Sequence, residues 1–114
     1  MNQPPQYSSY PGIGQWGKDN LHYSQTARIG NVIETSGQGG WDPVKTEVVI
    51  PKLLDEEIDQ AFQNINFALT TAGGKGFSQE VDAESSANIH AAWYDRLAVP
   101  GMRVEIEAWA YVEE

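Results

Sequence analysis

The chain has 114 residues, a length that suits one compact domain, and it contains no cysteine, which excludes disulfides and thiolate metal ligands. Its 16 acidic and 7 basic residues give a net charge of −9, which argues against a nucleic-acid or anionic-membrane partner. No apolar run reaches membrane-spanning length, so we expect a soluble cytoplasmic protein.

The N-terminal region is rich in Pro, Gln, Ser and Tyr and shows no periodicity. Residues 1–12 are therefore predicted to form a flexible tail, and residues 13–114 a single domain. Tyr10 and Trp16 carry the apolar surface with which part of this region could instead dock on the domain.

Short extended runs come next along the chain. Residues 23–29 and 32–36 flank Gly30 and Asn31, a pair that suits a two-residue hairpin turn. Residues 45–50 (KTEVVI) have the composition of a third short strand. The sequence therefore predicts a hairpin followed by one more extended segment.

One amphipathic helix is predicted over residues 54–72. Its apolar residues recur at helical spacing and form one stripe: Leu54, Ile58, Ala61, Phe62, Ile65, Leu69 and Ala72. Acidic residues crowd the first turn, where negative charge favours the helix dipole, and Gly73-Gly74 supplies the stop. Residues 75–92 give weak signals, with loop composition in the run DAESSAN.

The clearest strand is RVEIEAWAYV, at residues 103–112. Small and β-branched residues alternate with charged and aromatic ones, so one face is apolar and would pack on the helix. The other face carries Trp109 and Tyr111, which favours contact with a further surface. We therefore predict an α+β fold, with a helix on one face of a sheet and a polar, aromatic surface on the other.

Few residues suggest chemistry directly. Glu105 and Glu107 share one strand face, roughly 6.7 Å apart, where a carboxylate could hold a water or simply form a charged surface. The only imidazoles, His22 and His90, have neither metal-binding spacing nor cysteine companions, so no metal site is predicted. The run SGQGG at 36–40 could expose backbone N–H groups to an anion, or serve only as a turn.

Four stretches in order resemble the Rid family (reactive intermediate deaminases, also called YjgF-like or RutC-like), and within it the fungal-type branch. They are YSQTA at 23–27, SGQGGWDP at 36–43, EEIDQAFQNI at 56–65 followed by AGG, and PGMRVEIEAWA at 100–110. The resemblance implies a chorismate-mutase-like α+β domain that forms homotrimers with clefts between subunits. It also implies hydrolysis of a small enamine or imine to a carbonyl compound and ammonia, with no metal and no organic cofactor.

The resemblance also assigns roles to individual residues. Tyr23 matches the tyrosine that lines the cleft, and Glu105 matches the glutamate that positions the attacking water. Ser36 and Gly37 match the pair that touches the substrate, and Gln38 beside them is assigned to substrate binding as well.

Two departures from the family pattern are visible. Deaminating members grip the substrate carboxylate with an arginine, but here His90 falls near that position, and Arg96 and Arg103 are the nearest substitutes. We therefore assign His90 and Arg103 to substrate binding. The segment between residues 78 and 97 is also too short for a strand and a helix that the family normally has there.

Three functions remain open at this stage. The first is a cofactor-free imine or enamine hydrolase that acts on a small-molecule substrate. The second is a non-catalytic binding or interaction protein on the same scaffold, which the absent arginine favours. The third is a ribonuclease, an activity reported for some relatives, against which the net charge of −9 argues.

Overall fold

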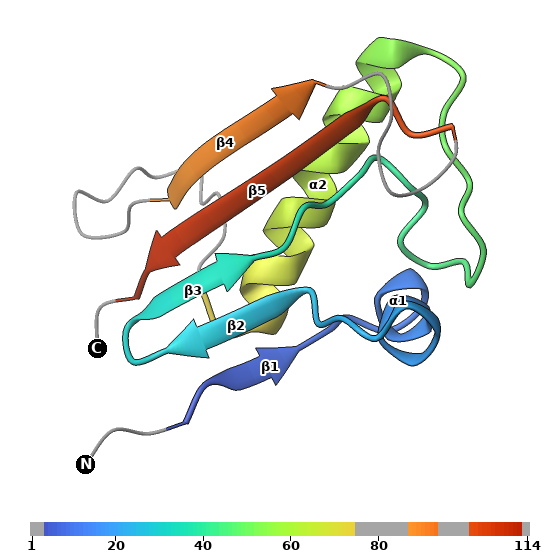
Figure 1. Cartoon of the computed structure of the whole chain (residues 1–114). Helices are drawn as coiled ribbons and strands as arrows, with labels where there is room; N and C mark the ends of the chain where they lie inside the picture. Colours follow the sequence, from blue (N-terminus) through green and yellow to red (C-terminus); the bar gives the residue numbers. More distant parts are fainter. Residues whose placement is uncertain (1–3, 75–86, 94–100, 113–114) are drawn as a thin grey trace.

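The computed structural model describes residues 4–74, 87–93 and 101–112. Five strands form one sheet in the order β1-β2-β3-β5-β4, and every neighbouring pair is antiparallel (Figure 1). The strands are β1 (Gln6–Ser8), β2 (Thr26–Ile29), β3 (Val32–Thr35), β4 (Ala87–Trp93) and β5 (Val104–Tyr111). The helices are α1 (Ile13–Leu21) and α2 (Leu54–Thr71).

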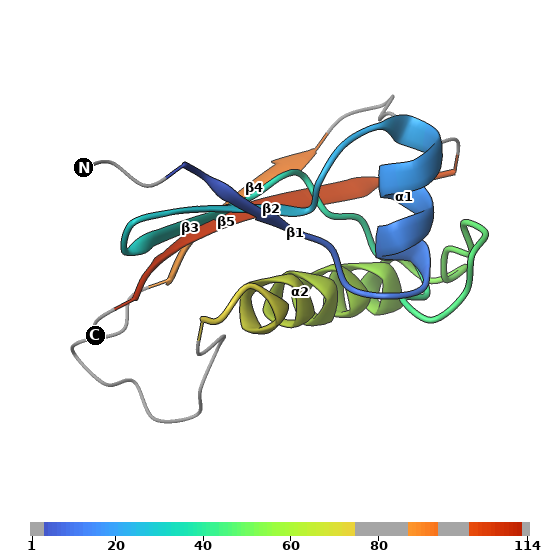
Figure 2. The ribbon, with the colours of Figure 1, turned by 90° about the horizontal axis from the view of Figure 1, so that it is seen from below.

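Helix α2 packs on one face of the sheet, and α1 lies at one end of it (Figure 2). The main core fills the layer between α2 and strands β3 and β5, and its buried members are Ile33, Ala61, Ile65, Leu69, Val104, Ile106, Ala108 and Ala110. This arrangement confirms the predicted α+β fold with a helix on one face. Neither of the two described helices combines the length and the hydrophobicity that a membrane span requires.

Helix α2 follows the sequence prediction to within one residue. Asp55, Glu56 and Glu57 occupy its first turn, where carboxylates interact favourably with the helix dipole. The helix ends in a glycine cap: Gly73 has a φ of +99°, and the N–H of Gly74 donates to the carbonyl oxygen of Leu69 at 2.9 Å.

The predicted hairpin is confirmed, whereas the prediction of a third short strand at residues 45–50 is wrong. Ile29 pairs with Val32, so Gly30 and Asn31 form the two-residue turn, with Gly30 at a φ of +59°. Residues 45–50 form no strand. Val48 and Ile50 instead pack from an irregular loop against a second core cluster, so their apolar character reflects burial rather than sheet pairing.

Residues 1–12 were expected to form a flexible tail, but they include β1, which pairs with β2 at the edge of the sheet. Tyr10 follows β1 and is fully buried, with its ring stacked on Phe67 at a centroid distance of 4.4 Å. The indole N–H of Trp41 donates to the Tyr10 hydroxyl at 2.9 Å. Burial raises the pKa of Tyr10 to about 12. The composition suggested a tail, but tertiary contacts at Tyr10 hold this part of the chain on the domain.

Strand β4 lies in a stretch whose composition indicated a strand only weakly. It pairs along β5 from the Ala87–Ala110 pair to the Trp93–Val104 pair. Between α2 and β5, β4 is the one element that the structure describes. The segment between residues 78 and 97, which we expected to be too short for the strand and helix of the family, contains β4. The rest of that segment lies outside the described residues, as does Arg96.

Candidate functional site

The centre of the candidate site is the contact between Glu105 on β5 and the backbone of Gly37, just after β3. Glu105 alternates with the buried residues of β5, so it belongs to the face turned away from α2, where it is half-buried. A methyl group built at Gly37 would overlap the Glu105 carboxyl group. The site therefore needs glycine at position 37, and the Glu105 carboxyl group lies directly against the chain there.

A β-bulge shapes this contact. Glu34 pairs with Trp109, and the next bridge joins Gln38 to Ile106. Three residues on the β3 side thus face two residues of β5, so the β3 side carries one extra residue. The bulge reverses the alternation of side chains, because Glu34 is exposed whereas Gln38 is fully buried.

Tyr23 and Glu105 are close enough to interact electrostatically. Partial burial raises the pKa of Glu105, and the neighbouring Glu107 raises it further. Burial also raises the pKa of Tyr23, with a smaller contribution from the negative charge of Glu105. Both groups hold their protons to higher pH than the free side chains do. A carboxyl group in this environment suits proton exchange with a water molecule.

Helix α1, which the sequence did not predict, packs against two residues of this region. A methyl group built at Gly17 would lie 3.0 Å from Cε1 of Tyr23, and one built at Gly14 would overlap the amide oxygen of Gln25. Gly14 and Gly17 are three residues apart and so lie on one face of the helix. The two glycines let α1 approach Tyr23 and Gln25 closely, which limits where the Tyr23 ring can lie.

Gln38 points into the protein rather than toward a ligand. Its side-chain oxygen accepts a hydrogen bond from Nε2 of Gln25 at 2.8 Å. Its Nε2 donates to the hydroxyl of Ser36 at 3.1 Å, to the carbonyl of Ser36 at 3.3 Å and to the carbonyl of Gly37 at 3.2 Å. The arrangement gives no support to direct substrate contact by Gln38, because the bulge buries it behind the Ser36–Gly37 segment.

Ser36 faces a surface pocket. The pocket has a volume of about 400 Å³, and its lining includes Tyr7, Ser24, Glu34 and Ser36. This lining offers hydroxyl groups and a carboxylate to a small polar molecule. Ser36 lines the pocket and precedes Gly37 in the chain, whereas Tyr23, Gly37 and Glu105 are not among the described residues that line it.

The sequence profile of the family described as "Endoribonuclease L-PSP" matches residues 18–85. That span includes Tyr23, Ser36 and Gly37 and covers more than half of the chain. The chain belongs to the L-PSP family. This is the YjgF/Rid family, so the resemblance found in the sequence is confirmed at the level of the family. A search of curated proteins returned no significant match.

Several solved structures share the fold. A structural-genomics protein called YJGH is 17% identical with a TM-score of 0.69, and the match covers 95% of each chain. Rv2704 from Mycobacterium tuberculosis, a member of the YjgF/YER057c/UK114 family, is 20% identical with a TM-score of 0.65, over 96% of this chain and 100% of that one. Yeast Mmf1 is 15% identical with a TM-score of 0.62, over 99% and 100%.

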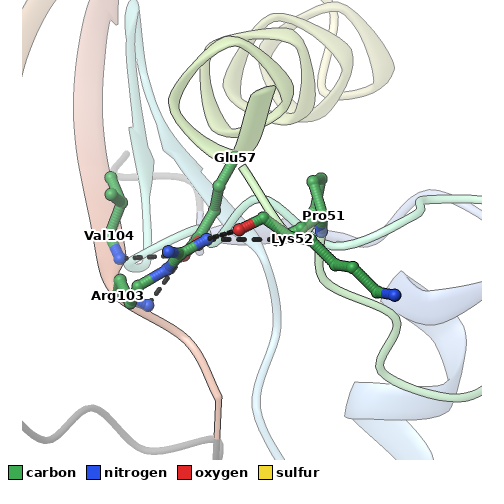
Figure 3. Close-up of polar contacts among 5 residues, drawn as sticks. All are labelled: Pro51, Lys52, Glu57, Arg103 and Val104. Atoms are coloured by element: carbon green, nitrogen blue, oxygen red, sulfur yellow. Dashed lines mark hydrogen bonds and ion pairs between the residues drawn. The ribbon is translucent and has the colours of Figure 1, made fainter. Parts of the chain in front are cut away.

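Arg103 is engaged elsewhere in this L-PSP family member (Figure 3). Its Nε lies 2.7 Å from Oε1 of the fully buried Glu57, and its NH2 group donates to the carbonyls of Pro51 and Lys52, each at 3.1 Å. The expected contact between Arg103 and substrate finds no support in this arrangement, because the guanidinium holds the start of α2 to the start of β5. Sequence reasoning missed this role of Glu57, although Glu57 lies four residues before buried Ala61 on the apolar stripe.

The remaining predicted site residue is His90. In the register between β4 and β5, the backbone of His90 pairs with Glu107 and that of Ala92 with Glu105. Strand β4 therefore lies beside the part of β5 that carries the two glutamates. The His90 side chain lies outside the described part of the structure. Among the residues that are described, no group of three or more His, Asp or Glu side chains is placed to hold a metal ion.

Proposed function

We propose that this protein hydrolyses a small imine or enamine to a carbonyl compound and ammonia. The observation that carries the proposal is the Glu105 carboxyl group, which lies against Gly37, interacts with Tyr23 and has a raised pKa. Membership of the YjgF/Rid family supports the same reading. The substrate would be a small molecule, bound beside Ser36 and Gly37.

The reaction needs a proton shuttle and nothing more from Glu105. The carboxylate takes a proton from water as the oxygen adds to the carbon of the protonated imine, which gives a carbinolamine. Glu105 then returns this proton to nitrogen. The carbon–nitrogen bond breaks and ammonia leaves, while the hydroxyl proton passes to the Glu105 carboxylate as the carbonyl forms. A raised pKa brings Glu105 closer to the value at which it can perform both halves of this exchange.

RNA is a poor candidate substrate, although the family description names an endoribonuclease. The net charge is −9, and Glu34, Glu105 and Glu107 share the sheet face that carries the site. Carboxylates at these positions would repel phosphates, and nucleic-acid sites normally neutralise them with Lys and Arg.

We further propose that the protein forms a homotrimer. The sheet face opposite α2 exposes large apolar side chains, and these are Tyr7 at 65%, Ile29 at 54%, Trp109 at 50% and Tyr111 at 46% exposure. The strand register places all four on the same face, because paired residues on neighbouring strands share a face of the sheet. One row of paired residues runs from Tyr7 through Ala27 and Glu34 to Trp109. A second row runs from Ile29 through Val32 to Tyr111, two residues further along each strand. An apolar surface of this kind marks a contact with another chain.

The test of catalysis is ammonia release from a 2-imino acid generated in situ by an amino-acid oxidase. Wild type should accelerate release, and Glu105→Ala should reduce the rate by at least about a hundredfold, the usual contribution of a proton-transfer group. Glu56→Ala, which removes an exposed carboxylate from α2, is the matched control and should keep full activity. Ammonia release no faster than in buffer would reject the proposal, and saturable binding of an unchanged ligand would identify a binding protein instead.

A further inference from the structure

Three buried groups form a hydrogen-bonded chain that ends at Ser36. The backbone N–H of Tyr10 donates to Oε1 of Gln25 at 3.0 Å. Nε2 of Gln25 donates to Oε1 of Gln38 at 2.8 Å, and Nε2 of Gln38 donates to Oγ of Ser36 at 3.1 Å. Tyr10, Gln25 and Gln38 are each 1% exposed or less.

The direction of this chain is fixed at its first member. A backbone N–H can only donate, so Gln25 must turn its oxygen toward Tyr10 and its NH₂ group toward Gln38. Gln38 must then accept with its oxygen and donate with its own NH₂ group. Turning either amide over would place two donors or two acceptors face to face in a buried site, which is costly.

The fixed orientation of Gln38 determines which hydrogen bonds the Ser36 hydroxyl can make. Because Oγ of Ser36 accepts from Gln38, its proton must point elsewhere. Within the described part of the chain, the hydroxyl donates to the main-chain carbonyl of Gln25 at 3.4 Å, a long and therefore weak hydrogen bond. That carbonyl already accepts the backbone N–H of Ser36 at 2.9 Å. A better acceptor in the pocket beside Ser36 would capture the hydroxyl proton.

We propose that Gln25 and Gln38 are positioning residues that make the Ser36 hydroxyl a hydrogen-bond donor to an acceptor oxygen of the ligand. Gln38 also holds the carbonyls of Ser36 and Gly37, so the same amide fixes the segment that contacts Glu105. The inference deepens the proposed function and rests on it for the nature of the ligand. A ligand that presents a carbonyl or carboxylate oxygen to Ser36 would be preferred over one that presents a donor there.

The test is a double-mutant cycle on ligand binding, with pyruvate as the probe, because this 2-oxoacid is what hydrolysis of a three-carbon 2-imino acid would leave. The dissociation constant is measured by calorimetry for wild type, Gln38→Met, Ser36→Ala and the double variant. Each single variant should weaken binding about tenfold, the effect of one hydrogen bond. Gln38→Met should cause a clearly smaller loss in the Ser36→Ala background than in wild type, because the part of its effect that passes through the hydroxyl is already removed there.

Controls separate this role from a merely structural one. Gln60→Met removes a partly buried amide from α2 that bonds Asn64 and not Ser36, and it should leave pyruvate binding unchanged. If Gln38→Met does not fold, the pair Gln25→Met with Gln38→Met removes both amides together and serves in the same cycle. Fully additive losses, or no pyruvate binding by wild type, would overturn the inference. Because the readout is binding, the cycle can succeed even where ammonia release fails.

Discussion

Glu57 of α2 and Arg103 at the start of β5 form a buried clamp in which one carboxylate accepts three hydrogen bonds. Oε1 accepts from Nε of Arg103 at 2.7 Å, while Oε2 accepts the backbone N–H groups of Arg103 at 2.7 Å and Val104 at 3.1 Å. The two N–H groups lie at the start of the strand that carries Glu105. The clamp therefore ties the position of the candidate catalytic carboxylate to the first turn of α2.

Arg103→Met should destabilise the protein strongly. It leaves the Glu57 carboxylate buried without its cation, and breaking such a pair costs about 3–5 kcal/mol. We expect about 3 kcal/mol, the low end, because the Arg103 side chain is 42% exposed. Urea denaturation measures the change. Arg28→Met is the matched control, since its exposed guanidinium bonds only the Gly30 carbonyl in the described structure, and it should change stability by less than about 1 kcal/mol.

Gly37→Ala should abolish function at a modest cost in stability. The new methyl group must displace the Glu105 carboxyl group, and overpacking of this kind costs about 1–3 kcal/mol. Ammonia release should fall as far as in Glu105→Ala. Gly30→Ala is a useful comparison, because it meets no atom within 4 Å but strains a φ of +59°, at about 1–2 kcal/mol. Equal activity in the two alanine variants would contradict the role given to Gly37.

Glu105→Gln should raise stability at neutral pH. The folded-state pKa of Glu105 is raised above 4.5, so the folded protein favours the protonated form. The stability that the protonated Glu105 side chain contributes is fully present below pH 4.5, and it is lost as the pH rises through the folded-state pKa. Glutamine removes this loss, so the variant should melt at a higher temperature than wild type at neutral pH. The difference in melting temperature should close as the pH falls below 4.5, and a difference that persists there would count against the assignment.

Trp109→Lys should separate the proposed trimer into monomers that remain folded. Trp109 is half exposed on the sheet face opposite α2 and pairs with Glu34, so a positive charge there costs little in the monomer but opposes burial between subunits. Sedimentation velocity distinguishes the two states. Val44→Lys, at a loop position that is 79% exposed, should leave the assembly intact. Wild-type protein that sediments as a monomer would remove the proposed contact altogether.

The spacing of apolar residues in the sequence identified those helices and strands in which buried side chains recur at a regular interval. The stripe of α2, the alternation of β5 and the Gly30-Asn31 turn were all readable because local pattern and final burial agree. Helix α1 was not, because it contains Gly14 and Gly17, which disfavour helix in isolation. Those glycines are instead explained by close contacts with Gln25 and Tyr23 that form only in the folded protein.

The site was predictable only in part for a related reason. Glu105 and the Ser36–Gly37 segment could be named from the sequence, and the structure places them in contact. Gln38 was assigned to substrate binding as the neighbour of Ser36 and Gly37, and simple alternation along an unbroken strand would put it on the same face as Glu34. The extra residue of the bulge instead turns the Gln38 side chain to the opposite face. The sequence of one strand does not reveal that it carries an extra residue relative to the strand it pairs with.

The buried position of Tyr10 bears on how the protein is prepared for study. A recombinant form trimmed to begin at residue 13 would discard the backbone N–H that orients Gln25, together with the ring that stacks on Phe67. Such a shortened protein would keep α2 and β5 yet leave both glutamine amides free to turn over. Its failure to recognise a ligand would then reflect the trimming, and assays belong on the untrimmed chain.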